Sequence, residues 1–354
     1  MSSDHSQIDA LPPTFGTLRP PESTSRGRYV LVALGYGLGL AFLYWVLHDF
    51  HPAKAWREVR NADWRWVGLG IFFDVVGYIL QAIRWRWLLE PFRKVRLAHA
   101  IRAIFAGVFA NMILPLRPGE LFRTYLLAKT EELSFGTVLG AVGVERLIDF
   151  VVATVGLGLA PFFAPLPREF RHWADLLAAV ALSLFGLLVA AVFYFEARLR
   201  REKAGIAAKP MPARIRAMLI GLHAMATSAS FYPAVLASVA MQGVQVLAFW
   251  AVMRAYHLPL PFLAAVVVLL IINIGISLPN APANVGAYQF FCVLGLSVFG
   301  MEKTSATGFS IFAFMVLTLP FLFLGFWAVV RSGLTLHEMR EKLRAMPREG
   351  PCRN

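Results

Sequence analysis

Residues 305–330 read SATGFSIFAFMVLTLPFLFLGFWAVV, an uninterrupted run without a charged side chain. About 20 apolar residues in a helix span the roughly 30 Å hydrocarbon core of a bilayer, so this run is long enough to cross a membrane. The composition of the whole chain also indicates a membrane protein. Of its 354 residues, 58% are hydrophobic and 16% are charged, whereas soluble domains average about 25% charged residues. The sequence therefore predicts an all-α polytopic membrane protein.

Further apolar runs reach comparable lengths and carry few charges. They are residues 29–48, 67–82, 147–163, 176–195 and 232–256. Two longer segments, 98–127 and 263–299, are interrupted by LPLRPGE (114–120) and LPNAPANVG (278–286). Lipid satisfies no backbone N–H or C=O group, so irregular backbone at membrane depth must be buried in protein or line a wet cavity. We therefore expect about six full transmembrane helices and two re-entrant broken-helix hairpins, eight membrane segments in all; the alternative for each broken segment is two ordinary helices joined by a surface turn.

The net charge of +13 comes largely from basic clusters in the tails and at the ends of apolar runs. This pattern is typical of positive-inside and lipid-headgroup charge, and it does not indicate a nucleic-acid-binding domain. Placing the clusters that precede the first run, follow 67–82 and 176–195, and close the chain in the cytoplasm puts both termini there. The first hairpin then opens to the cytoplasm and the second to the outside. The basic, tryptophan-rich segment 54–66 is an exception, and it predicts an external interfacial helix.

The order of clean helix, broken segment and clean helix occurs twice, over residues 67–163 and 232–330. The two broken segments also share Asn, Pro and Gly in the same order. Because the charge pattern gives the halves opposite orientations, the sequence predicts an inverted repeat, which in transporters places the substrate site near the midplane between discontinuous helices. This transmembrane domain would cover residues 29–331, between a disordered cytoplasmic tail (1–28) and a cytoplasmic C-terminal tail (332–354).

The first broken segment carries three charges at helical spacing, Arg117, Glu120 and Arg123. In a helix Glu120 pairs with either arginine, which leaves one guanidinium free. A guanidinium donates two parallel hydrogen bonds to a phosphate, and a half-helix beginning near Pro118 would add its free N–H groups. These residues are candidate ligands for a lipid phosphate; a surface helix cap with solvated charges is the alternative.

A second group of ionisable residues, Glu145, Arg146 and Asp149, shares one helix face at the mouth of the apolar run 147–163. Such groups are costly in a membrane unless they pair or face a cavity. They therefore either bind substrate or form an internal salt bridge that fixes this helix to its neighbours. Asp74 is a lone carboxylate within the run 67–82. It is a candidate acceptor for an arginine of either group, a proton site or a plain structural partner.

The second broken segment offers polar side chains without charge. Its candidates are Asn280, Asn284, Tyr288 and Gln289, and Asn111 stands at the corresponding place in the first segment. These residues can line a polar cavity and bind a lipid headgroup. The chain contains no hydrolase, zinc-protease or Walker A motif, and its eight histidines lack metal-ligand spacing. We therefore expect no catalytic residues, no cofactor and no metal.

Four motifs stand in order along the chain: RWRWLL (84–89), LPLRPGELFR (114–123), ERLID (145–149) and P-x-x-P-x-x-x-G (279–286). Together they resemble the transmembrane region of the lysylphosphatidylglycerol synthases, the flippase-like domain of the multiple-peptide-resistance factor proteins. The resemblance covers about residues 30–330 and implies a bacterial inner-membrane protein that moves a lipid, such as an aminoacylated phosphatidylglycerol, between leaflets. Two departures from the family pattern matter. The soluble synthase domain has no counterpart here, so we expect no synthase activity, and Gln289 replaces the usual acid, which argues against a cationic headgroup at that position.

Three functions fit these residues. The first is a flippase or scramblase-like transporter of a phospholipid or another lipid with an anionic headgroup. The second is a lipid-binding membrane protein that does not transport. The third is a lipid-modifying enzyme that uses Asp74, Glu145 and Asp149 as acid–base groups. Membrane lipids are the expected partners, nucleic acid is not, and homo-oligomerisation is left open.

Overall fold

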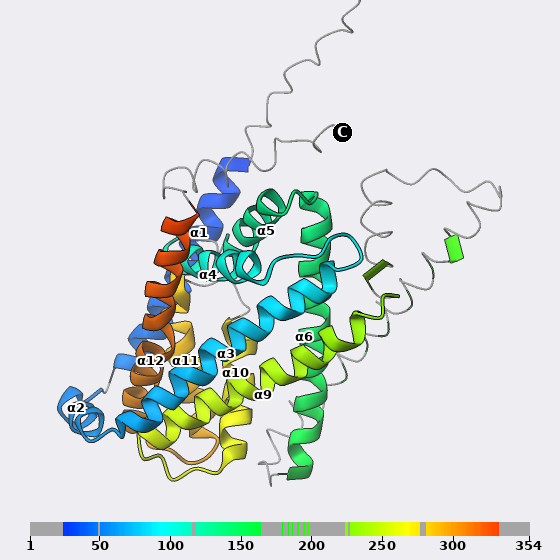
Figure 1. Ribbon diagram of the computed structural model, residues 1–354. Coiled ribbons are helices and arrows are strands. Elements are labelled where there is room, and N and C mark those ends of the chain that lie inside the picture. Colours follow the sequence, from blue (N-terminus) through cyan, green and yellow to red (C-terminus); the bar gives the residue numbers. More distant parts are fainter. Residues whose placement is uncertain are drawn as a thin grey trace, which may run out of the picture.

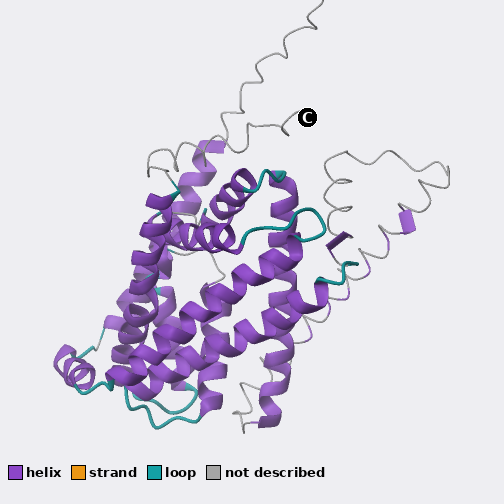
Figure 2. Cartoon of the chain, viewed as in Figure 1, coloured by secondary structure: helices purple, strands orange, loops and turns teal. Residues whose placement is uncertain are grey.

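A computed structural model of the chain describes residues 24–48, 50–114, 118–163, 224–225, 227–276 and 281–332, together with single positions between 179 and 198. Within these residues every regular element is a helix, and Figure 2 shows helices and loops only. The prediction of an all-α protein is confirmed for this part of the chain.

The helices differ widely in length, and their order follows the predicted alternation of long and broken segments. They are α1 (Thr24–Leu47), α2 (Pro52–Arg60), α3 (Trp64–Leu89), α4 (Leu97–Ile113), α5 (Gly119–Thr130), α6 (Phe135–Phe163), α9 (Phe231–Ala255), α10 (Phe262–Ile276), the 3₁₀ turn η1 (Pro282–Asn284), α11 (Ala287–Ser297) and α12 (Lys303–Arg331). Among the described residues, α3, α9 and α12 are long and apolar enough to cross a membrane. Shorter apolar helices cover Ala33–Leu47, Leu97–Ile113 and Phe262–Ile276.

The predicted runs and the helices differ at two places. The run 147–163 is only the second part of α6, which begins twelve residues earlier at Phe135. Glu145, Arg146 and Asp149 therefore lie within a helix rather than at its mouth, because ion pairs with neighbouring helices accommodate their charges. Likewise α3 continues to Leu89, past the predicted end at residue 82. The run 176–195 lies outside the described residues except at single positions.

Each broken segment contains two short helices that pack against each other. α4 packs against α5, and α10 packs against α11. α5 has 12 residues and α11 has 11, so at 1.5 Å per residue they extend only about 18 and 16 Å. Neither crosses a roughly 30 Å hydrocarbon core by itself. Residues 115–117 and 277–280, where the breaks were predicted, lie outside the described residues.

The helix contacts are preserved when the two halves are exchanged. α3 and α9 run side by side through the middle of the molecule (Figure 1) and form its most extensive contact. The pairs α4·α5, α5·α6 and α3·α4 have the counterparts α10·α11, α11·α12 and α9·α10. Also within the halves, α3·α6 corresponds to α9·α12. Across the halves, α4·α12 and α3·α12 correspond to α10·α6 and α9·α6. The buried apolar side chains also form two clusters, one around Trp85 and Phe122 and the other around Phe249 and Phe309.

The turn before α11 depends on a glycine in close contact with α1. Gly286 has φ +86°, and its N–H donates to Gln289 Oε1 at 2.8 Å. A Cβ at this position would collide with the carbonyl oxygen of Gly39 on α1. The aromatic rings of Phe42 and Phe290 stack beside this crossing, 4.4 Å between centroids. The turn therefore needs both the left-handed backbone and the absence of a side chain.

Gly300 provides a matched control, because its φ is +74° and a Cβ there would meet nothing within 4 Å. Gly300→Ala should lower the free energy of unfolding by about 1–2 kcal/mol, the penalty for a left-handed L-residue. Gly286→Ala adds the steric conflict with α1, which contributes about 1–3 kcal/mol more. Thermal unfolding in detergent should therefore order the proteins as wild type, Gly300→Ala, Gly286→Ala. Equal losses in the two variants would contradict the close α1 contact.

Candidate functional site

Four helices bring polar side chains together inside the first apolar cluster. α3 contributes Gln81, Arg84 and Trp85, which share one face because they are spaced three and four residues apart. α6 contributes Glu145 and Asp149, one helical turn apart. α5 and α9 complete the group with one residue each, Arg123 and Ser238. We call these seven residues the charge cluster.

Arg84 is the centre of the charge cluster. Its side chain is fully buried, and its Nη2 atom lies 2.8 Å from Glu145 Oε1. Its Nη1 atom forms an ion pair with Asp149 and donates to Ser238 Oγ at 3.0 Å. One guanidinium therefore ties α3 to both α6 and α9, and a planar group with a fixed fork suits this task better than an ammonium.

Glu145 is also fully buried and accepts from several donors. In addition to Arg84, Gln81 Nε2 donates to Oε1 at 2.6 Å, and the Trp85 indole N–H donates to Oε2. Arg123 Nη2 lies 3.3 Å from both carboxylate oxygens, and the Arg123 guanidinium carbon lies 4.8 Å from the centre of the Trp85 ring. This carboxylate therefore stays charged within an apolar core because cations and N–H dipoles surround it.

The charge cluster is neutral overall but contains donors without acceptors. Two guanidinium groups, of Arg84 and Arg123, face the two carboxylates of Glu145 and Asp149. The Nε atoms of both arginines are buried and have no hydrogen-bond partner among the described residues. Buried N–H groups are seldom left unpaired, so each such group calls for an explanation. A ligand with acceptor oxygens would supply one.

A half-exposed ion pair lies near the charge cluster. Arg146 on α6 pairs with Glu120 on α5, and their side chains are 54% and 40% exposed. Among the described residues, Glu120 therefore pairs with Arg146 and not with Arg123 of its own segment. Because α5 packs against α6, Arg123 contacts Glu145 while Glu120, three residues earlier, contacts Arg146. Arg117 lies outside the described residues.

The structure gives local roles to two of the predicted polar residues. Asn111 Oδ1 accepts from the Gly119 N–H at 2.7 Å and so caps the start of α5. That N–H is one of those expected to hold a phosphate, and it already has a partner. Gln289 accepts from Gly286 in the same way at the start of α11. The two broken segments therefore use an amide side chain at the same structural place, although one amide lies before its helix and the other within it.

The remaining candidates lie around the second broken segment. Asn284 Oδ1 and Tyr288 Oη are buried without a hydrogen-bond partner among the described residues. Asp74 is half-buried on α3 and lies within electrostatic range of Tyr288. None of these three residues has a described hydrogen bond or ion pair to the charge cluster. Asn280 lies outside the described residues.

Sequence reasoning did not assign site roles to Gln81, Arg84, Trp85 or Ser238. The sequence pattern places Arg84 among the basic residues beyond a helix end, because the apolar run stops at residue 82. The available signal was the motif RWRWLL itself, whose arginine and tryptophan follow Gln81 at helical spacing. Within the described residues, no group of three or more His, Cys, Asp or Glu side chains is arranged to hold a metal ion.

Comparison with known proteins identifies related chains. The family model described as the lysylphosphatidylglycerol synthase TM region matches residues 32–325. A curated UPF0104 membrane protein of Methanocaldococcus jannaschii is 23% identical over 177 residues. The alignment covers 46% of this chain and 52% of the relative, so the chain spans about half the length of the curated relative that it matches.

Proposed function

The chain belongs to the lysylphosphatidylglycerol synthase TM region family, and from this premise we propose that it translocates a lipid with an anionic headgroup between the leaflets of a bacterial inner membrane. The observation that carries the proposal is the buried charge cluster, with two guanidinium N–H groups that have no acceptor in the described part of the chain. Ionisable residues inside transmembrane helices are rare, and where they occur they mark substrate or ion pathways. We propose transport without chemical change of the lipid.

In this proposal Arg123 is the principal ligand of the lipid phosphate. It contacts Glu145 through Nη2 alone, at 3.3 Å, while its Nε–H has no acceptor among the described residues. Arg84 contacts its carboxylates through both terminal nitrogens and is better suited to hold the helices together. The half-exposed pair of Glu120 and Arg146 would then form the entrance, because weak exposed ion pairs open at little cost.

The helix packing supports an alternating-access mechanism. The helix contacts are preserved when the halves are exchanged. Each half also contains a helix, α5 or α11, that is too short to span the bilayer. This is the arrangement expected of an inverted repeat with discontinuous helices. We propose that the two hairpins enter the membrane from opposite sides and that both termini are cytoplasmic. The basic residues at 93–96 and Arg331, which lie at the C-terminal ends of α3 and α12, support this orientation.

The proposal is tested with Arg123→Lys. Lysine keeps the charge that Glu145 needs but loses the fork and the Nε–H, so the fold should persist while phosphate binding weakens. The loss of one charge-assisted hydrogen bond, about 1.5–3 kcal/mol, corresponds to roughly ten- to a hundredfold in lipid affinity. Native mass spectrometry of retained phosphatidylglycerol and dithionite quenching of a fluorescent phosphatidylglycerol in proteoliposomes measure binding and translocation.

Arg146→Lys is the matched control, since it makes the same change in a half-exposed ion pair and should have a much smaller effect. Wild-type retention and translocation in Arg123→Lys would contradict the phosphate role. The buried donors of the neutral cluster would also serve a second candidate, a lipid-binding protein without transport. Retention of lipid together with no translocation by the wild type would select that candidate. Altered masses of the recovered lipid would instead indicate an enzyme.

A further inference from the structure

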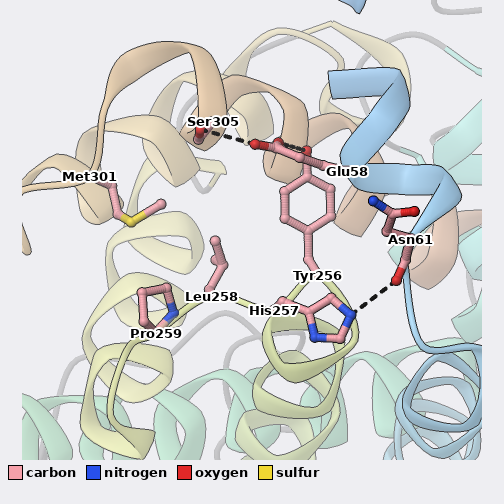
Figure 3. A pocket seen from close by; sticks show the side chains of 8 residues that line it. All are labelled: Glu58, Asn61, Tyr256, His257, Leu258, Pro259, Met301 and Ser305. Carbon is pink, nitrogen blue, oxygen red and sulfur yellow. Dashed lines mark hydrogen bonds between the residues drawn. The ribbon is translucent and has the colours of Figure 1, made fainter. Parts of the chain in front are cut away.

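A polar pocket lies far from the charge cluster, where α2, the α9–α10 loop and the start of α12 meet (Figure 3). Its volume is about 350 Å³, within the range of about 300–1,000 Å³ that small-molecule sites occupy. Arg84 stands 20 residues beyond Trp64 on α3, about 30 Å along the helix. The pocket lies near the Trp64 end, so the two sites are near opposite ends of the molecule.

A carboxylate without a direct ion pair among the described residues forms one wall of this pocket. Glu58 accepts from the Tyr256 hydroxyl at 2.6 Å and from Ser305 Oγ at 3.3 Å (Figure 3). Both partners are neutral, and no ion pair of Glu58 is found among the described residues. Lys54, one turn earlier on α2, is bound to Glu302 at 2.6 Å, and this hydrogen bond raises the pKa of Lys54. The half-buried carboxylate of Glu58 is thus held by two hydroxyl groups, and Lys54 acts on it only at longer range while bound to Glu302.

The opposite wall adds further acceptors and an apolar surface. His257 Nε2 lies 3.0 Å from the backbone carbonyl oxygen of Asn61. Because a carbonyl only accepts, Nε2 carries the proton, and in the neutral ring Nδ1 is then an acceptor. The Asn61 amide also lines the pocket, and Leu258, Pro259 and Met301 provide apolar contacts. A group with several N–H donors on a short alkyl chain matches these walls.

We propose that this pocket binds a ligand through a primary ammonium group, with Glu58 as its counter-ion. An ammonium has three N–H donors, and the carboxylate, the imidazole nitrogen and the amide oxygen are suitable acceptors. The chemistry is therefore that of a primary ammonium on a short alkyl chain, either in an ethanolamine lipid headgroup or on a molecule free in solution. This inference is independent of the anionic-lipid site.

The full-length protein in detergent provides the test, by native mass spectrometry after incubation with phosphatidylethanolamine or phosphatidylcholine. The trimethylated headgroup of phosphatidylcholine has no N–H donor, so the wild type should retain phosphatidylethanolamine about tenfold better, as expected for one charge-assisted hydrogen bond. Glu58→Gln should remove this preference. Glu132→Gln is the matched control, because it removes the same charge from the exposed ion pair with Arg93, and neither residue lines the pocket.

Competition by free phosphoethanolamine at equal concentration would identify a soluble ligand, and competition only by the lipid would identify a headgroup; both results support the ammonium site. Equal retention of the two lipids by the wild type would overturn it without any variant, so the test stands even if Glu58→Gln fails to fold. Equal losses in Glu58→Gln and Glu132→Gln would also overturn it. Arg123→Lys should leave this preference unchanged, which separates this inference from the proposed translocation.

Discussion

Glu145→Gln should lower the free energy of unfolding by about 3–5 kcal/mol, because it leaves two buried guanidinium groups without their shared carboxylate. The glutamine has nearly the same shape, so the loss reports the charge and not a cavity. Gln81 and Trp85 donate to different carboxylate oxygens, so the amide NH2 would also face one of these two donors. A large fall in melting temperature and in yield is the expected result.

Glu120→Gln is the matched control for this prediction. It makes the same substitution in the ion pair with Arg146, whose side chains are 54% and 40% exposed. Water screens this pair, so the expected loss is at most about 1 kcal/mol. The double variant of Glu145→Gln with Arg123→Gln should lose less than the sum of the single variants, since the second change removes one uncompensated charge. Additive losses would show that the two residues do not interact.

Single cysteines at Leu116 and Ala283 should be labelled from opposite sides of the membrane by an impermeant thiol reagent. The reason is that the proposed hairpins enter the bilayer from opposite faces, each with its break inside the protein. The background replaces Cys292, which is buried, and Cys352 by alanine. Accessibility in sealed cells, compared with permeabilised cells, gives a yes-or-no result for each position.

Positions outside the hairpins calibrate the labelling. A cysteine at Trp56 on α2 should be labelled from the outside, and one at Lys94, between α3 and α4, only after permeabilisation. Labelling of Leu116 and Ala283 from one side would contradict the inverted orientation. The preserved helix contacts would then reflect two halves in parallel orientation, and the alternating-access proposal would be lost.

The two halves share their packing but not their chemistry. The first half buries Arg84, Arg123 and Glu145 in its core. In the second half, α10 and α11 contain no charged residue, and those of α12 are at its ends, Lys303 and Arg331. An exchange-symmetric scaffold whose buried charges lie in one half only, among the described residues, would give a lipid phosphate a single preferred binding position. In the second half, the buried oxygens of Asn284 and Tyr288 have no hydrogen-bond partner among the described residues. This half therefore offers a polar but uncharged surface.

The sequence by itself determined the class of fold and most of its elements. Apolar runs free of charge predict helices wherever they occur, because lipid leaves the backbone no other partner than itself. The proline and glycine residues at 114–120 and 278–286 marked both breaks, and the motif residues pointed to the family. The ends of α3 and α6 were missed because both helices continue through charged residues, which a local pattern assigns to the membrane surface.

Only the tertiary structure decided which charges meet. Arg146 and Asp149 share one face of α6, yet Arg146 pairs with Glu120 from α5, and Asp149 pairs with Arg84 from α3. The reason is physical: a buried charge takes its partner from whichever helix packs against it, and the sequence distance of 61 to 65 residues between Arg84 and its carboxylates leaves no local trace. The pocket at Glu58 arose in the same way, from segments that are adjacent in space but nearly 200 residues or more apart in the chain.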